Sequence, residues 1–186
     1  MLTIPATTLL PMSENLVPPD PGSLVVVVDH DDAWPGVFGQ QRARLERALG
    51  PVALEVHHAG STAVPGLAAK AIIDVVLVVP DPADEAAYAP VLEAEGLVFA
   101  SRHPAWHQHR LFKDRSPRTN VHVFPPGCEE VRRMLAFRDH LRRDASDREL
   151  YERTKRELAG RTWAVVQDYA DAKSDVVAEI MARALM

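Results

Sequence analysis

Cysteine is almost absent from this sequence. Cys128 is the only one among 186 residues, so an intrachain disulfide framework and a cysteine-rich zinc site are both excluded. No stretch approaches the ~20 consecutive apolar residues that a membrane helix needs. Residues 1–12 contain no Lys or Arg and are interrupted by Pro5 and Pro11, a composition unlike that of a signal peptide. These absences predict a cytoplasmic protein with no membrane partner.

A surplus of positive charge is also missing. The formal net charge of -5 argues against a protein that coats nucleic acid, because neutralising phosphates requires many Lys and Arg side chains on one face. The 47% of hydrophobic and 25% of charged residues are typical of a folded globular chain, and its length suits one domain. We therefore expect one folded domain without a nucleic-acid partner.

Proline marks the first part of the chain. Residues 1–22 contain Pro5, Pro11, Pro18, Pro19 and Pro21. This density disfavours a helix, because proline lacks the backbone N–H and clashes with the preceding turn. We expect residues 1–22 to form an extended arm and residues 23–186 to form the folded domain.

Hydrophobic periodicity predicts strands and helices along the rest of the chain. Strands are expected at 24–28, 52–56, 71–79, 97–100, 110–113 and 120–124. Helices are expected at 34–49, 84–95, 129–143, 147–159 and 163–185, the last three forming a C-terminal helical cap. The pattern predicts an α/β (α+β) fold with helices around a sheet.

A lone carboxylate, Asp74, interrupts the apolar run 71–79. Burying an ionised group without a partner costs several kcal/mol, so Asp74 should face a site or a partner. Gly60 and Ser61 precede it where a strand meets a loop. There a glycine lets backbone N–H groups approach a phosphate, and the serine adds a hydroxyl donor. A phosphate cradle followed by a metal-binding Asp is suited to nucleotidyl transfer. A tight turn followed by a buried, loop-capping Asp explains the same residues.

The segment around these residues also matches a known family. Residues 58–74 read HAGSTAVPGLAAKAIID, which closely resembles the GrpB-like signature E-H-I-G-S-T-A-V-P-G-L-x-A-K-P-I-I-D. Further matches are Trp34 with Phe38, Val121-His122-Val123, the segment 135–142, Tyr151 with Lys155, and Tyr169 with Lys173. The resemblance covers roughly residues 24–185.

The resemblance implies a nucleotidyltransferase-like fold, in which a short mixed sheet flanked by helices carries the Gly-Ser pair and the Asp. Our first hypothesis for the function is transfer of a nucleotidyl group from a nucleoside triphosphate to a small acceptor, with Asp74, Ser61 and His122 as catalytic residues. The family's domain also resembles one fused to dephospho-CoA kinase in some bacteria. The alternative is a catalytically inactive module that binds a nucleotide or a coenzyme A-related ligand.

The sequence departs from active nucleotidyltransferases at the metal site. These enzymes generally carry a second carboxylate two residues after the first, on the same face of the strand, so that both can hold Mg²⁺. Here that position is Val76, and a later strand offers His122. One carboxylate with one histidine suits Zn²⁺ or Mn²⁺ better than Mg²⁺. We expect any divalent metal to be held by Asp74 and His122, with His58 as a further ligand. A strand-end histidine bonded to backbone is the alternative for His58.

Basic side chains supply candidate contacts for phosphate. Gly60 and Ser61 would cradle the phosphates, and Lys70 closes their loop and can reach them as a point charge. Arg138 and Arg142 are four residues apart, which places them on one helix face where they can fork a phosphate. The other candidates are Arg110, Arg118 and Lys155. Salt bridges to neighbouring acidic residues are the alternative for each arginine.

These candidates are expected to meet. Because strand side chains alternate in direction, Ser61, Asp74 and His122 can share one face if their strands are neighbours. We expect them to converge with Arg110 and Arg138 on one cleft between the sheet and the C-terminal helices. Three other histidines, His103, His107 and His109, are more typical of an exposed loop than of a metal site. Trp106 and Trp163 are expected to be packing residues.

Overall fold

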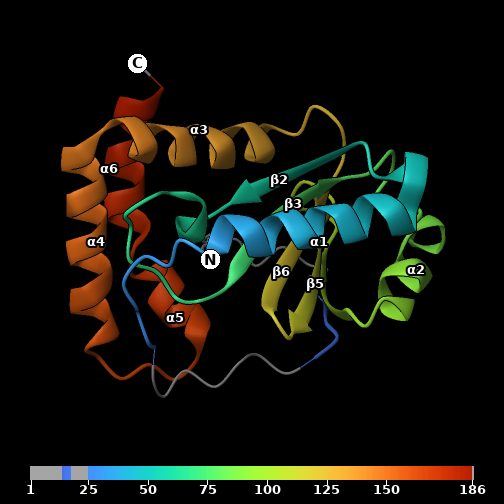
Figure 1. Ribbon diagram of the computed structural model, residues 1–186, viewed down its shortest axis with the longest axis horizontal. Coiled ribbons are helices and arrows are strands. Elements are labelled where there is room, and N and C mark those ends of the chain that lie inside the picture. The colour runs from blue at the N-terminus through green and yellow to red at the C-terminus, as the bar shows by residue number, and fades with distance from the viewer. Residues whose placement is uncertain (1–13, 18–24, 186) are drawn as a thin grey trace.

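The computed structural model describes residues 14–17 and 25–185, which form a six-stranded mixed sheet flanked by helices (Figure 1). The strands are β1 (Glu14–Asn15), β2 (Glu55–Ala59), β3 (Ile73–Val78), β4 (Val98–His103), β5 (His109–Arg115) and β6 (Arg118–Phe124). The helices are α1 (Trp34–Leu49), α2 (Ala89–Ala94), α3 (Glu129–Arg143), α4 (Ala145–Ala159), α5 (Val166–Asp171) and α6 (Ser174–Ala184). The order across the sheet is β1-β4-β5-β6-β3-β2, and among the described strands only β3 and β6 run parallel.

The two faces of the sheet are covered by different helices. Val75 and Val121 lie on the face that packs against α1 and α2, which we call the α1 face. Figure 1 shows α1 crossing in front of the sheet. Val76 and its neighbour His122 lie on the opposite face, where Val76 packs against Met134 of α3; we call this the α3 face. Both faces of β3 are therefore buried, as its continuous apolar run predicts.

Helices α4, α5 and α6 gather beside one end of the sheet (Figure 1). Val64 and Leu67, from the loop between β2 and β3, pack with Leu141, Tyr151 and Ile180 from three different helices. This loop, which contains Gly60 and Ser61, is thus held between the sheet and the helical cap. The predicted mixed α+β fold with a C-terminal cap is confirmed. No helix in the described part of the chain is long and apolar enough to cross a membrane.

Several predicted elements match closely. Helices α1 and α3 begin and end at the predicted residues. Helix α4 begins two residues earlier than predicted, because the Asp144 carboxylate caps it by accepting a hydrogen bond of 2.9 Å from the Asp147 N–H. Strands β3 to β6 overlap the predicted ranges.

One predicted strand is absent and another is shifted along the chain. Residues 25–28 form a single bridge, between Val28 and Ala69, instead of a strand over 24–28; Leu24 lies outside the described residues. The β-branched composition is suitable, but the segment finds no further partner among the described strands. The strand predicted at 52–56 begins at Glu55, because Pro51 enters a 3-10 turn that ends at Val52.

Two predicted helices are interrupted. Residues 84–95 form a 3-10 turn and then α2, whose first turn contains Pro90, a residue suited to starting a helix rather than continuing one. Residues 163–185 form α5 and α6, with Lys173 between them. Of the predicted arm, residues 1–13 and 18–22 lie outside the described residues, whereas β1 pairs with β4 at the edge of the sheet. The domain limits stay a prediction.

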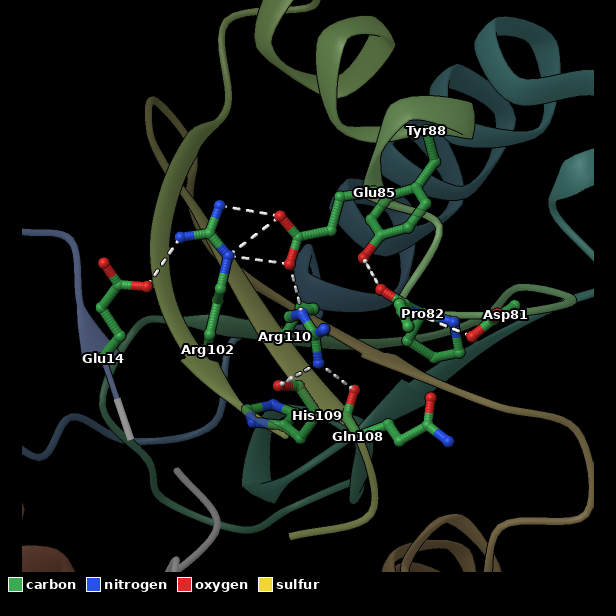
Figure 2. Close-up of polar contacts among 10 residues, drawn as sticks. Glu14, Asp81, Pro82, Glu85, Tyr88, Arg102, Gln108, His109 and Arg110 are labelled. Atoms are coloured by element: carbon green, nitrogen blue, oxygen red, sulfur yellow. Dashed lines mark hydrogen bonds and ion pairs between the residues drawn. The ribbon is translucent and has the colours of Figure 1, made fainter. Parts of the chain in front are cut away.

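An ion-pair network ties this edge of the sheet to the loop before α2 (Figure 2). Glu85 accepts hydrogen bonds from Arg102 at 2.7–2.9 Å and from Arg110 at 2.6 Å. Arg102 also donates to Glu14 at 2.9 Å, and the Arg110 guanidinium donates to the Gln108 carbonyl at 2.8 Å. Because Arg110 is buried, Glu85 supplies the charge that its guanidinium needs.

Replacing Glu85 should therefore destabilise the fold. We expect Glu85→Gln to lower the free energy of unfolding by roughly 2–3 kcal/mol, because a buried guanidinium loses its counter-charge. Glu14→Gln, which removes a more exposed partner of Arg102, should cost less than about 0.5 kcal/mol. Urea unfolding at pH 7 measures both values.

The loss in Glu85→Gln should also depend on pH. Burial opposes ionisation of Glu85, but hydrogen bonds from Arg102 and Arg110 outweigh it and lower its pKa. A carboxyl group whose pKa is lowered in the folded state stabilises the fold at pH values above its unfolded pKa. This stabilisation is lost as the pH falls through the pKa of the folded state. The gap between wild type and variant should thus narrow below about pH 4. Equal costs for Glu85→Gln and Glu14→Gln at pH 7 would contradict this account.

Candidate functional site

The candidate site is built around a close contact between the Gly60 backbone and the Asp74 carboxylate. Antiparallel pairing of β2 with β3 places Ala59 opposite Asp74, and Gly60 follows with a φ of 69°. A Cβ atom at Gly60 would lie 2.3 Å from Asp74 Oδ2, well inside contact distance. Glycine is therefore required both for the positive φ and for the close approach.

Asp74, Asn120 and His122 share the α3 face, as predicted for Asp74 and His122. The Asn120 amide donates to Asp74 Oδ1 at 2.9 Å. His122 Nε2 lies 3.8 Å from the same oxygen and has no hydrogen-bond partner in the described part of the chain. Burial alone would raise the pKa of Asp74, but the neighbouring His122 and Asn120 favour the carboxylate and its pKa lies below the ordinary value.

A row of buried histidines continues from His122 across the sheet. His122 Nδ1 and His109 Nε2 are 3.0 Å apart, and the rings of His109 and His103 stack with centroids 5.4 Å apart. Burial holds the pKa of His109 well below its usual value, so its ring is neutral near pH 7. The expectation of an exposed loop is thus wrong for His103 and His109, because both lie in strands whose α3 face is covered.

His58 does not join Asp74 and His122. Its pairing with Val75 directs it to the α1 face, where its ring stacks on Phe38 with centroids 4.5 Å apart. His58 Nε2 lies 3.1 Å from the Thr62 hydroxyl, and burial lowers the pKa of His58 to about 4. The prediction of His58 as a third metal ligand is wrong, since the register of β2 turns it away.

One group of three potential metal ligands does lie close together elsewhere in the described residues. It consists of His140, Asp144 and Asp147 near the start of α4. Arg183 already donates two hydrogen bonds to Asp147, at 2.5 and 2.8 Å. These carboxylates therefore have structural partners at the junction of α3, α4 and α6.

Lysines surround a pocket next to Ser61, which has a volume of about 300 Å³ including its open mouth. Its lining includes Ser61, Asp74, Lys70, Lys155 and Lys173. The chain contains four lysines, so three of the four reach this one pocket. This local cluster of positive charge contrasts with the net charge of -5 of the whole chain.

The two Tyr-x-x-x-Lys pairs account for this convergence. Lys155 Nζ lies 4.9 Å from the centre of the Tyr151 ring, and Lys173 Nζ lies 4.5 Å from that of Tyr169. Lys155 also donates to the Ala68 carbonyl. Burial, and then repulsion between neighbouring lysines, lowers the pKa of Lys155 and of Lys173 to about 7. Sequence reasoning named Lys155 as a basic contact but missed Lys173.

Arg138 and Arg142 fasten the Gly-Ser loop to α3. Arg138 donates to the His58 carbonyl at 2.8 Å, and Arg142 donates twice to the Ala63 carbonyl, at 3.0 and 2.7 Å. Asp139 accepts from both guanidinium groups, at 2.8 and 3.2 Å. The two arginines thus hold the backbone on either side of Ser61 with the donors that were expected to fork a phosphate.

The predicted convergence is correct in part. Ser61 and Asp74 line one pocket, His122 stands beside Asp74, and Arg138 contacts the same loop. Arg110 is the exception: its pairing with Val123 directs it to the α1 face, where it binds Glu85 (Figure 2). Its assignment to the cleft is wrong. Arg118 is exposed at the start of β6, whereas the Trp163 indole packs in the cap and donates to the Leu158 carbonyl at 2.9 Å.

The mixed sheet, its Gly-Ser loop and the buried Asp define a mixed α+β protein with a candidate site around Gly60, Ser61 and Asp74. The chain belongs to the GrpB family, because the family model described as GrpB protein matches residues 24–183.

Known proteins agree with this assignment. The UPF0157 protein BH1888 of Halalkalibacterium halodurans is 50% identical over 160 residues, which cover 86% of this chain and 82% of that protein. The crystal structure of GrpB from Enterococcus faecalis superposes with a TM-score of 0.76 and 27% identity, covering 86% of this chain and 97% of that one.

The role of Gly60 can be separated from the general cost of a positive φ. Gly60 and Gly66 have φ values of 69° and 74°, but a Cβ at Gly66 would meet nothing within 4 Å. Gly66→Ala should lower the free energy of unfolding by about 1–2 kcal/mol. Gly60→Ala should cost clearly more, because the added methyl displaces Asp74 or the loop. Urea unfolding of both variants measures the difference, and equal losses would show that the contact with Asp74 is unimportant.

Proposed function

We propose that this protein binds a nucleotide through its phosphates in the lysine pocket beside Ser61. The observation that carries the proposal is the convergence of Lys70, Lys155 and Lys173, three of the chain's four lysines, on that pocket. A phosphate chain is the biological ligand best matched to several clustered ammonium groups. Ser61 would add a hydroxyl donor at the mouth of the same pocket.

The buried lysines of the pocket favour binding of an anion. Burying several ammonium groups together costs free energy, and their pKa values of about 7 reflect that cost. A bound phosphate supplies the missing counter-charge, so the lysines become protonated as it binds. Asp74 supplies one negative charge to the lining and offsets only part of the positive charge. The Gly60 backbone keeps this carboxylate covered.

Binding should therefore weaken as the pH rises through 7. We expect inorganic tripolyphosphate to raise the melting temperature more at pH 6.5 than at pH 8.5, because the lysines of the free protein lose their protons over this range. The free protein should itself become more stable as the pH rises, since its unfolded lysines still bind protons. Thermal unfolding across this pH range, with and without tripolyphosphate, tests both trends.

Lys173→Met is the matched variant for this pocket, and Lys113→Met, which alters the one lysine outside it, is the control. We expect Lys173→Met to weaken tripolyphosphate binding at least tenfold, about 1.4 kcal/mol, by removing a charge-assisted hydrogen bond. Lys113→Met should bind like the wild type. Similar affinities in both variants would refute the assignment of the pocket.

Nucleotidyl transfer to a small acceptor is the second candidate. It is favoured by the spacing of Asp74 Oδ1 and His122 Nε2, because 3.8 Å suits two ligands of one divalent metal and the histidine nitrogen has no other partner among the described residues. A metal there would offset charge on a phosphate during transfer. With Val76 in place of a second carboxylate, Zn²⁺ or Mn²⁺ suits the pair better than Mg²⁺. An inactive module that binds a nucleotide or a coenzyme A-related ligand needs no such ion.

Variants of this pair distinguish the two candidates. If the protein uses a metal, Mn²⁺ or Zn²⁺ should add to the melting-temperature rise given by ATP, and Asp74→Asn or His122→Gln should abolish that addition. His57→Gln, at a half-buried site on β2 where the ring pairs with Glu55, is the control and should keep this addition. If the metal still raises the melting temperature further in Asp74→Asn, Asp74 is not a ligand of that metal. The same rise with and without metal in the wild type would favour the inactive module.

A further inference from the structure

Ser61 also lines a second pocket, whose lining contains none of the lysines. This pocket, which we call the α3 pocket, has a volume of about 600 Å³ including its open mouth. Its walls are mainly Met134 and Phe137 of α3, Tyr151 of α4 and Met181 of α6. The Phe137 and Tyr151 rings meet edge to face with centroids 5.2 Å apart. Methionine and aromatic walls of this kind favour a flat apolar group.

One charged side chain in this lining, Glu130, has a carboxylate oxygen without a hydrogen-bond partner in the described part of the chain. The Glu130 side chain is 6% exposed, and its Oε1 atom has no hydrogen-bond partner within the described residues. Its other oxygen is 3.4 Å from an Arg133 guanidinium nitrogen. A buried carboxylate oxygen without a donor costs free energy, and burial correspondingly raises the pKa of Glu130. A hydroxyl or amino group on a ligand would supply the missing hydrogen bond.

We propose that the α3 pocket binds an apolar or aromatic group that carries a hydroxyl or amino group, with that polar group hydrogen-bonded to Glu130. The proposal rests on the proposed function for its biological meaning, because Ser61 places this group next to the bound phosphates. The group can belong to the nucleotide itself or to a separate acceptor molecule. Both sources share the same chemistry, and competition separates them.

The test uses two probes that differ by one hydroxyl, 2-phenylethanol and ethylbenzene. Amide chemical shifts of the full-length protein report the affinity and the place of binding. We expect both probes to shift resonances of residues lining the α3 pocket, with 2-phenylethanol binding about fivefold more tightly because of the hydrogen bond to Glu130. Shifts confined to other surfaces, or equal affinities, would overturn the proposal.

Glu130→Met and Glu129→Met form a matched pair on consecutive positions of α3, the first buried and the second exposed. Glu130→Met should bind the two probes equally, whereas Glu129→Met should keep the fivefold preference. Val177→Trp, which fills the pocket from α6, should abolish binding of both probes. A preference that persists in Glu130→Met would overturn the proposal even if Val177→Trp fails to fold.

Competition identifies the source of the group. Displacement of 2-phenylethanol by ATP but not by tripolyphosphate would place the nucleoside in the α3 pocket. Simultaneous binding of ATP and 2-phenylethanol would assign the pocket to a separate acceptor. Tripolyphosphate binding is measured on the same samples, so failure of the lysine pocket is recognised independently of failure of the α3 pocket.

Discussion

The close approach of the Gly60 backbone to the Asp74 carboxylate is the contact on which the rest of the site depends. It covers the carboxylate, which leaves Asp74 almost fully buried with Asn120 as its amide donor. It also fixes where the chain turns after β2, and so places Ser61 between two pockets. Arg138 and Arg142 add to this constraint by holding the carbonyls on either side of Ser61. A side chain at Gly60 would disturb all of these together.

The distribution of charge explains how an acidic protein can contain a basic pocket. The formal net charge is -5, yet three of its four lysines lie around one cavity, while the arginines around the site bind carbonyls and carboxylates. A lysine carries its charge at the end of a flexible side chain and can become neutral when it is buried, whereas an arginine stays charged. Arginine therefore suits permanent hydrogen bonds to carbonyls and carboxylates. Lysine suits a buried pocket, because loss of protons lowers the repulsion between neighbouring ammonium groups.

Sequence patterns predict best the helices and strands whose ends are set by neighbouring residues in the chain. Helix α1 ends at Gly50, whose positive φ stops it, and the position of α3 follows from apolar spacing alone. Asp74 was identifiable because a carboxylate inside an apolar strand needs a partner. Arg110 was misplaced because its direction depends on which residue of β6 it faces, and only the register shows that this is Val123. His58 was misplaced for the same reason on β2. A local sequence pattern does not show which residues of two strands face each other, so it cannot assign a side chain to one face of the sheet.

The hydrogen bond between His122 and His109 determines what the Asp74 site can hold. If His122 donates from Nδ1, its Nε2 carries a lone pair that can bind a metal shared with Asp74. If His109 donates instead, His122 Nε2 carries the proton and points it toward the carboxylate. The two tautomers are therefore alternatives, one for a metal and one for a direct contact. His109 takes the complementary tautomer in each case, because its burial keeps the ring neutral with one nitrogen facing His122.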